Sequence, residues 1–293
     1  MHPFGDGVKV ENSRVTIRDE AVLATDMMDE LVRDAVFGQG QAKDHAHWLL
    51  WEIGQAVGVQ PASIHDLYMA RGRGEVHGFT VPAINARGMA YDTARAVFRT
   101  AVRQRAGAFI LEIARSEIAY TDQRPREYVA VMLAAALREG FRGPLFIQGD
   151  HFQVNAKKFA VDARGEVAAV KQLAQEAIAA GFFNIDVDTS TLVDISLPTL
   201  DDQQRANYQT AVDIVRYIRG IEPPDVTISM GGEIGEVGAH NSTVPELRAF
   251  MGGFERTLGE RADRSMVGLS KISVQTGTSH GGVVLPDGSI AAV

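Results

Sequence analysis

The sequence predicts an α/β protein built as a (β/α) barrel. Short apolar runs alternate six times with amphipathic helical segments, the pattern of parallel strands joined by right-handed crossovers. Polar residues follow every predicted strand, as in a barrel, whereas an open sheet gathers them at one crevice. No glycine-rich nucleotide fingerprint follows the first strand, so an open, doubly wound dinucleotide-binding sheet loses its main support.

The central predicted strand spans residues 144–151, with the sequence Pro-Leu-Phe-Ile-Gln-Gly-Asp-His. Its apolar part has no polar face, which is typical of a strand buried on both sides of a parallel sheet. Gly149 frees the backbone where the strand must turn. Asp150 and His151 then follow at the C-terminal tip, where α/β folds keep their chemistry.

The other elements are expected on both sides of this strand. Residues 1–75 should form an N-terminal arm and a helical extension, and residues 76–293 the barrel. The extension contains a helix from about residue 19 to the break at residues 37–40. A second helix follows and ends at residue 57, and a third runs from residue 61 to about residue 69. The remaining barrel strands are predicted at residues 79–85, 109–114, 183–187, 226–234 and 271–276. The barrel helices are predicted at residues 91–105, 126–138, 166–180, 201–219 and 244–258.

Composition narrows the function classes. The chain has 293 residues and a net charge of −8, which argues against nucleic-acid binding because that requires basic patches. It has no cysteine, so a metal would be held by His, Asp or Glu. No apolar run has the length of a membrane span, and no signal peptide is visible at the N-terminus. The expectation is a cytoplasmic enzyme with no membrane contact.

Chemistry-bearing residues collect at the predicted strand tips. Two histidines and a glutamate from separate strands have the donor types of a zinc or similar divalent site. A neighbouring carboxylate that does not bind the metal would move a proton. The backbone N–H groups of the glycine-rich stretch 277–282 suit an anionic group. Taken singly, each residue also has a structural interpretation, since an Asp before a His often only caps a helix. The tip residues are Asn85, the stretch Ala114 to Glu117, Asp150, His151, Asp186, Asp188, Glu233, Glu236 and His280.

Five short motifs, in matching order and spacing, resemble those of class II, metal-dependent fructose-bisphosphate and tagatose-bisphosphate aldolases. The resemblance covers roughly residues 79–285. The motifs are Val81-Pro82-Ala83-Ile84-Asn85, Gly149-Asp150-His151, Asn184-Ile185-Asp186, Glu233-Ile234-Gly235-Glu236-Val237-Gly238 and Gly277-Thr278-Ser279-His280-Gly281.

The resemblance implies a lyase of carbohydrate metabolism such as glycolysis, with a zinc-dependent TIM barrel that forms homodimers or tetramers. Its reaction reversibly joins dihydroxyacetone phosphate to an aldehyde, so the substrate would be a phosphorylated ketose. His151, Glu233 and His280 would hold Zn²⁺ or another divalent metal. Asp150 would pass a proton to the aldehyde oxygen. The residues implied in substrate binding are Asn85, Asp186, Gly277, Ser279 and Gly281.

The sequence departs from the family in three places. Residues 239–241 are Ala-His-Asn where the family has an acidic pair, which leaves Glu236 as the proton-abstracting base. The second strand ends at Ala114 instead of a small hydroxyl residue. Only six βα units are visible, so the last two units, with the family's third metal histidine, are missing from the pattern. An alternative is therefore a non-catalytic homologue that binds a sugar phosphate or supports a partner. A metal-dependent hydrolase is a third, weaker hypothesis.

Overall fold

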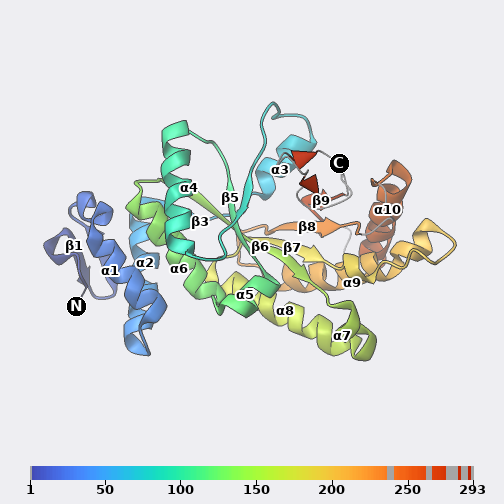
Figure 1. Cartoon of the computed structure of the whole chain (residues 1–293), viewed down its shortest axis with the longest axis horizontal. Coiled ribbons are helices and arrows are strands. Elements are labelled where there is room, and N and C mark those ends of the chain that lie inside the picture. Colours follow the sequence, from blue (N-terminus) through green and yellow to red (C-terminus); the bar gives the residue numbers. More distant parts are fainter. Residues whose placement is uncertain (1, 236–240, 262–265, 275–282, 285–289, 292–293) are drawn as a thin grey trace. The chain divides into compact units, whose positions relative to one another are not determined.

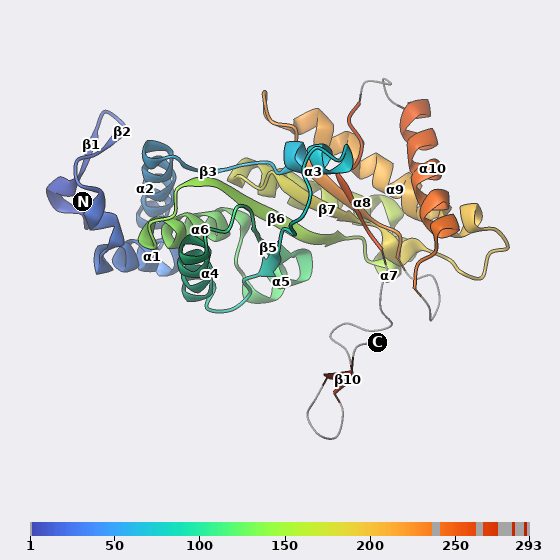
Figure 2. The same cartoon turned by 90° about the horizontal axis from the view of Figure 1, so that it is seen from above.

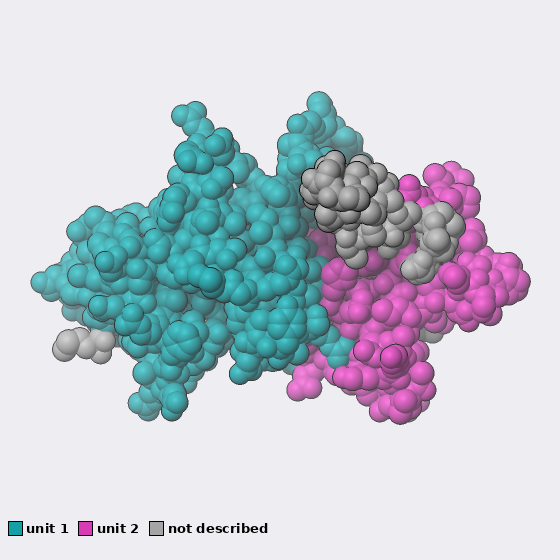
Figure 3. All heavy atoms as spheres, in the orientation of Figure 1, with its two compact units in different colours: residues 1–150, 175–184 teal, residues 151–174, 185–293 magenta. Residues whose placement is uncertain are grey.

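The computed structural model describes residues 2–235, 241–261, 266–274, 283–284 and 290–291. The chain forms two compact units (Figure 3). Unit 1 consists of Met1–Asp150 and Gln175–Asn184, and unit 2 of His151–Ala174 and Ile185–Val293. No helix in the described ranges is both long and apolar enough to span a membrane. The domain boundary expected near residue 75 stays a prediction.

The strands of the main sheet have the order of the sequence, β4-β5-β6-β7-β8-β9, and β3 pairs with β6 (Figure 1). The pairs β3–β6, β4–β5, β5–β6 and β8–β9 are parallel. Sequential parallel strands alternating with helices are the topology of a (β/α) barrel that is incomplete, which confirms the predicted fold class. The strands are β3 (Val59–Pro61), β4 (Ala83–Asn85), β5 (Ile110–Ala114), β6 (Gly143–Gln153), β7 (Asn184–Asp188), β8 (Ser229–Glu233) and β9 (Lys271–Ser273).

Helices follow the strands where the periodicity predicts them. The other described strands form two short antiparallel ribbons. One pairs β1 (Val8–Glu11) with β2 (Arg14–Ile17), and the other pairs β10 (Val283–Val284) with β11 (Ile290–Ala291). The helices are α1 (Asp26–Phe37), α2 (Gln41–Val57), α3 (His65–Gly72), α4 (Ala90–Gln104), α5 (Arg115–Thr121), α6 (Pro125–Arg138), α7 (Ala156–Val161), α8 (Ala163–Ala180), α9 (Leu200–Ile221) and α10 (Val244–Arg261).

The core of unit 1 forms around α6. This helix starts with Pro125 at its first position, where a missing N–H costs nothing, and most of its residues are buried. It packs against α1, α2 and α4, and α1 also packs against α2 (Figures 1 and 2). Since α6 is apolar almost all round, it needs neighbours on every side, and the N-terminal helices supply them.

The core of unit 2 includes a close contact between α9 and α10 (Figure 2). Gly253 of α10 makes it possible, because a Cβ there would lie 2.2 Å from the Tyr208 ring of α9. Helix α9 starts at a Thr199 cap, whose hydroxyl accepts from the Asp202 amide at 3.1 Å. The helix is thereby fixed beside the ends of β7 and β8, where the candidate site lies.

Strand β3 and helix α5 were not expected from the sequence, and neither were α7, β10 and β11. Strand β3 has three residues between a helix and a turn, too few to show a period, and it exists because it pairs with β6. Helix α5 occupies part of a predicted loop. Its Glu117 side chain accepts from the Ala114 amide at 2.9 Å and so satisfies a donor at the helix start.

Candidate functional site

His151 lies near the end of β6 in an unusual backbone conformation. Its φ is +41°, a region that costs free energy for a residue with a side chain. The His151 side chain remains 46% exposed. A half-exposed imidazole at the C-terminal end of a parallel strand is available to a ligand, and the backbone strain suggests that the surroundings hold it there.

Asp188, the last residue of β7, holds the His151 ring. The Nδ1 atom of His151 lies 3.0 Å from Oδ2 of Asp188, and Gln153 donates to the same oxygen at 2.5 Å. The other oxygen, Oδ1, accepts from the amide and the hydroxyl of Ser190, at 3.0 and 2.6 Å. Asp188 is only 2% exposed. This carboxylate is therefore fixed from both oxygens.

The pKa of Asp188 reflects two opposed effects. Burial disfavours the charged form and on its own raises the pKa, while hydrogen bonds from His151, Ser190 and Gln153 lower it. The hydrogen bonds prevail, and the pKa of Asp188 lies below its usual value. The site consequently keeps a negative charge at neutral pH.

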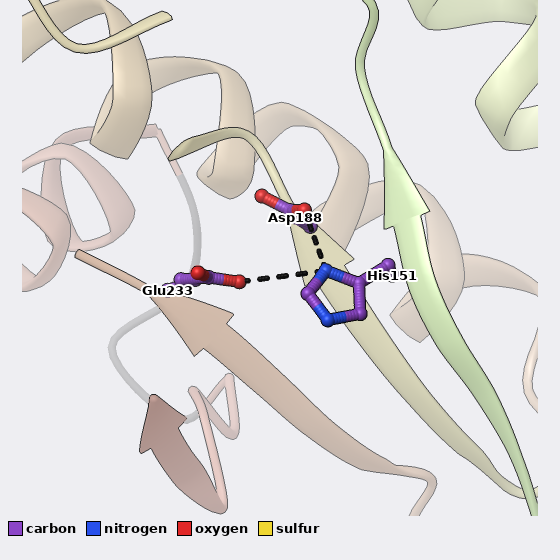
Figure 4. A group of neighbouring side chains, drawn as sticks. All are labelled: His151, Asp188 and Glu233. Atoms are coloured by element: carbon purple, nitrogen blue, oxygen red, sulfur yellow. Dashed lines mark hydrogen bonds and ion pairs between the residues drawn. The ribbon is translucent and has the colours of Figure 1, made fainter. Parts of the chain in front are cut away.

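Glu233, at the end of β8, is the third member of the group. One of its carboxylate oxygens lies 3.6 Å from Nδ1 of His151, and the Glu233 side chain is 19% exposed. Figure 4 shows both carboxylates directed at the same ring nitrogen. One donor atom from each of His151, Asp188 and Glu233 lies within 4.8 Å of the other two.

This donor set fits a divalent cation. Imidazole nitrogen with carboxylate oxygens is the ligand chemistry of zinc and related ions. Tetrahedral ligands about 2.0 Å from an ion lie about 3.3 Å from one another. The separations of 3.0 and 3.6 Å from Nδ1 lie on either side of that value. Binding an ion through Nδ1 requires that this nitrogen carry no proton, so metal and proton compete for it.

Helix α9 holds the backbone of the two strand ends. The Asn207 amide donates to the Glu233 carbonyl at 2.9 Å, and its Oδ1 accepts from the Thr189 hydroxyl at 2.6 Å. Gln204 donates to the Ile234 carbonyl at 2.8 Å. Asn207 is fully buried. One amide thus ties the residue after Asp188 to Glu233 itself, and this fixes the two carboxylate-bearing tips relative to each other.

Gly235 allows the loop after β8 to approach the loop after β7. Its φ is +74°, and a Cβ there would lie 2.8 Å from the Ser190 carbonyl oxygen. Because Ser190 is the residue that fixes Oδ1 of Asp188, this close approach is part of how the site is built. Packing of the two loops therefore explains why a glycine stands at this position.

Asp186 points to a different partner. Its Oδ1 lies 2.9 Å from the Lys271 ammonium of β9. Gly231 of β8 leaves room for this pair, since a Cβ there would lie 2.3 Å from Asp186 Oδ1 and 2.8 Å from Lys271 Cε. The resemblance assigns Asp186 to substrate binding, which stays a prediction, and the carboxylate beside His151 belongs to Asp188. Both lie on one face of β7, because side chains two apart share a face.

Unit 1 brings Asn85 and Asp150 together. Asn85, at the end of β4, donates to Asp150 of β6 at 2.8 Å and to Glu117 of α5 at 3.3 Å. Glu117 also accepts from Arg87. Two predicted site residues therefore share one polar cluster. The signal for Glu117 was its place three residues after a strand end, within a stretch expected to be a loop.

The remaining predicted site residues lie outside the described part of the chain. They are Glu236, Gly277, Ser279, His280 and Gly281. His280 as a metal ligand and Glu236 as a base thus stay predictions.

Comparison with known proteins finds distant similarity to solved structures. No protein-family model and no curated protein matches the chain. Among solved structures, it is similar to a protein from Sinorhizobium meliloti 1021 described as a probable tagatose 6 phosphate kinase. The TM-score is 0.46 and the identity 17%, over 63% of this chain and 48% of that one. The match thus spans about half the length of the other protein.

Proposed function

We propose that the chain is a metal-dependent lyase that cleaves a phosphorylated ketose to dihydroxyacetone phosphate and an aldehyde. The observation that carries the proposal is the approach of Asp188 and Glu233 to Nδ1 of His151, at 3.0 and 3.6 Å. These three residues would hold Zn²⁺ or another divalent cation. The substrate class rests on the resemblance of the sequence motifs to those of class II aldolases.

The bound cation would supply Lewis-acid stabilisation for the negative charge that develops beside a carbonyl group when a neighbouring proton or carbon is removed. Before the cation binds, the contact of Asp188 with Nδ1 holds the His151 ring in place. Asn207 and Gly235 keep Glu233 and Ser190 in register with it. These residues would therefore act by orienting the donor atoms before substrate arrives.

Proton transfer is assigned to carboxylates that do not bind the cation. In the condensation direction Asp150, the chain neighbour of His151, would pass a proton to the aldehyde oxygen, and in cleavage it would take that proton back from the hydroxyl. Asn85 would orient the carboxylate through its 2.8 Å hydrogen bond. Glu236 is proposed as the base that abstracts a proton next to the carbonyl. Substrate contacts are proposed for Asn85, Asp186 and the residues Gly277, Ser279 and Gly281. We also propose a homo-oligomer, a dimer or a tetramer.

Metal content and aldol cleavage, measured together, test the proposal. We expect the purified protein to carry a divalent metal, and to cleave fructose or tagatose 1,6-bisphosphate in an assay coupled to dihydroxyacetone phosphate. A chelator should abolish cleavage, and metal should restore it. His151→Ala should bind no metal and remain inactive, while His77→Ala, which alters an exposed histidine of unit 1, should behave as wild type.

Cleavage that survives complete removal of metal would contradict the proposed chemistry. Absence of cleavage and of metal, together with a saturable rise in melting temperature on addition of sugar phosphate, would support the non-catalytic sugar-phosphate-binding alternative. Turnover of esters or amides with ketose phosphates left intact would point to the hydrolase.

A further inference from the structure

A pocket in unit 1 lies outside the proposed metal centre. It has a volume of about 430 Å³ and is formed by α2, α6 and the C-terminal part of α8, and α2 and α6 pack against each other. This volume is in the range of small-molecule sites. Trp48 and Trp51 of α2 line it, and they are the two tryptophans of the chain. The apolar lining residues are Val129, Ala130, Leu133, Ala179 and Ala180.

One buried polar side chain of this pocket has a ring nitrogen without a hydrogen-bond partner among the described residues. His47 is 7% exposed and lines the pocket. Its Nε2 lies 2.7 Å from the Ala35 carbonyl oxygen, and because a carbonyl only accepts, Nε2 must carry the proton. In the neutral ring, Nδ1 is then an acceptor. That Nδ1 is buried and has no hydrogen-bond partner in the part of the chain that the structure describes.

The neutral form of His47 is the one that burial favours. Burial is the largest effect on its pKa and lowers it, while the Ala35 hydrogen bond acts in the opposite direction with less effect. A buried acceptor without a donor costs free energy, so the pocket stabilises a molecule that brings a donor.

The charged lining residues already have partners. Arg126 donates to Asp44 at 2.9 Å, and Glu176 accepts from the guanidinium of Arg124 at 2.9 Å. Neither of these charges needs a counter-charge from a bound molecule. The pocket therefore offers aromatic and aliphatic surface, a single buried acceptor and no unbalanced charge.

We propose that this pocket binds a small, neutral aromatic molecule that carries one hydroxyl or amine donor, with the rings of Trp48 and Trp51 against its apolar surface and Nδ1 of His47 accepting from its donor. Aromatic rings favour such contacts through stacked and edge-to-face arrangements. The site shares no residue with the proposed metal centre, so the proposal does not depend on the proposed function.

Phenol and anisole form a matched pair of probes, because methylation removes the O–H donor and keeps the ring. Tryptophan emission reports on this pocket alone, since both tryptophans line it. It is read at an excitation wavelength that neither probe absorbs. We expect phenol to change the emission saturably and to bind about fivefold more tightly than anisole, although anisole is the more apolar molecule.

Two variants of the full-length chain complete the experiment. His47→Phe keeps an aromatic ring but removes the acceptor, and the preference for phenol should disappear. Ala179→Leu changes an exposed lining residue, leaves His47 intact and occupies part of the pocket, so both probes should bind more weakly. Circular dichroism checks that each variant is folded. Equal affinity for the two probes, no saturable change with either, or unchanged binding by folded Ala179→Leu would overturn the proposal.

Discussion

Two turns of identical local design follow one another after β7. In Asp188-Thr189-Ser190, Oδ1 of the aspartate accepts from the serine amide at 3.0 Å and from the serine hydroxyl at 2.6 Å. In Asp194-Ile195-Ser196 the same two bonds have the same two lengths. Asp188 is buried and its second oxygen faces His151 and Gln153, whereas Asp194 is exposed.

The difference shows that the turn is a local property and the site is not. An aspartate two residues before a serine makes this turn wherever the chain permits it. Only the first turn lies beside the end of β6, so only Asp188 acquires an imidazole partner. The pKa of Asp194 is lowered by the hydrogen bonds from Ser196. At Asp188, the hydrogen bonds that lower the pKa must also offset burial, which raises it.

Removal of the His151 imidazole should have the largest effect, because it removes the partner that only the Asp188 turn has. In His151→Ala, we expect divalent metal affinity, measured by isothermal titration calorimetry, to fall by about 100-fold or more, because the only nitrogen donor of the described group is lost. Glu233→Gln should weaken binding in the same direction. Retained affinity in folded His151→Ala would show that the three residues do not form a metal centre.

Loss of the hydrogen bonds that α9 makes to the two strand ends should have the next largest effect on metal affinity. Asn207→Ala leaves the Glu233 carbonyl without its buried amide donor, while the Thr189 hydroxyl loses Oδ1 and keeps the main-chain carbonyl of residue 207 as an acceptor at 2.9 Å. We expect a loss of roughly 3 kcal/mol in the free energy of unfolding, measured by urea denaturation of metal-free protein. Metal affinity should fall about tenfold, since Glu233 and the turn that follows Asp188 lose their common support. A folded Asn207→Ala with unchanged affinity would remove Asn207 from the positioning role.

Gly235 packs against Ser190, which belongs to the Asp188 turn. In Gly235→Ala, the positive φ and the contact with Ser190 should lower the free energy of unfolding by roughly 2 kcal/mol and disturb the Asp188 turn. Gly220→Ala, in α9, is the matched control because a Cβ there meets nothing within 4 Å. It should be neutral or slightly stabilising. Equal effects of the two substitutions in thermal melts would contradict this account of the loop contact.

The pH dependence of stability gives the smallest effect. A carboxylate whose folded pKa is lowered stabilises the protein above its unfolded pKa, about 3.9, and loses that contribution as pH falls through the folded value. Asp188→Asn should therefore cost about 1 kcal/mol at neutral pH in metal-free protein and progressively less below about pH 4. Asp194→Asn should change little at any pH, because solvent screens an exposed carboxylate. A constant difference down to low pH would be inconsistent with the assigned shift.

Hydrophobic period was enough to predict the fold class and most helix positions. Helix α6, predicted at 126–138, spans Pro125–Arg138, and α9, predicted at 201–219, spans Leu200–Ile221. Strand β3 was missed because three residues show no period, and it depends on a partner more than eighty residues away in sequence.

The candidate site was predicted only in part, since local sequence does not encode which strand ends meet. His151 and Glu233 were predicted as metal ligands, and the structure brings them into one group whose donor atoms lie within 4.8 Å of one another. Asp186 and Asp188 were both expected at this strand end, on one face of β7, but only Asp186 was given a role in the site. The two aspartates differ in their partners, since Asp186 pairs with Lys271 and Asp188 with His151. Both partners come from distant parts of the chain.

Metal titration of Asp188→Asn beside Asp194→Asn tests the central claim most directly. Both substitutions replace an aspartate that accepts the same two serine bonds, so the local damage is matched. If His151, Asp188 and Glu233 hold a divalent cation, Asp188→Asn weakens its binding by about tenfold to 100-fold and Asp194→Asn leaves it at the wild-type value. Equal affinities in the two folded variants would contradict the claim.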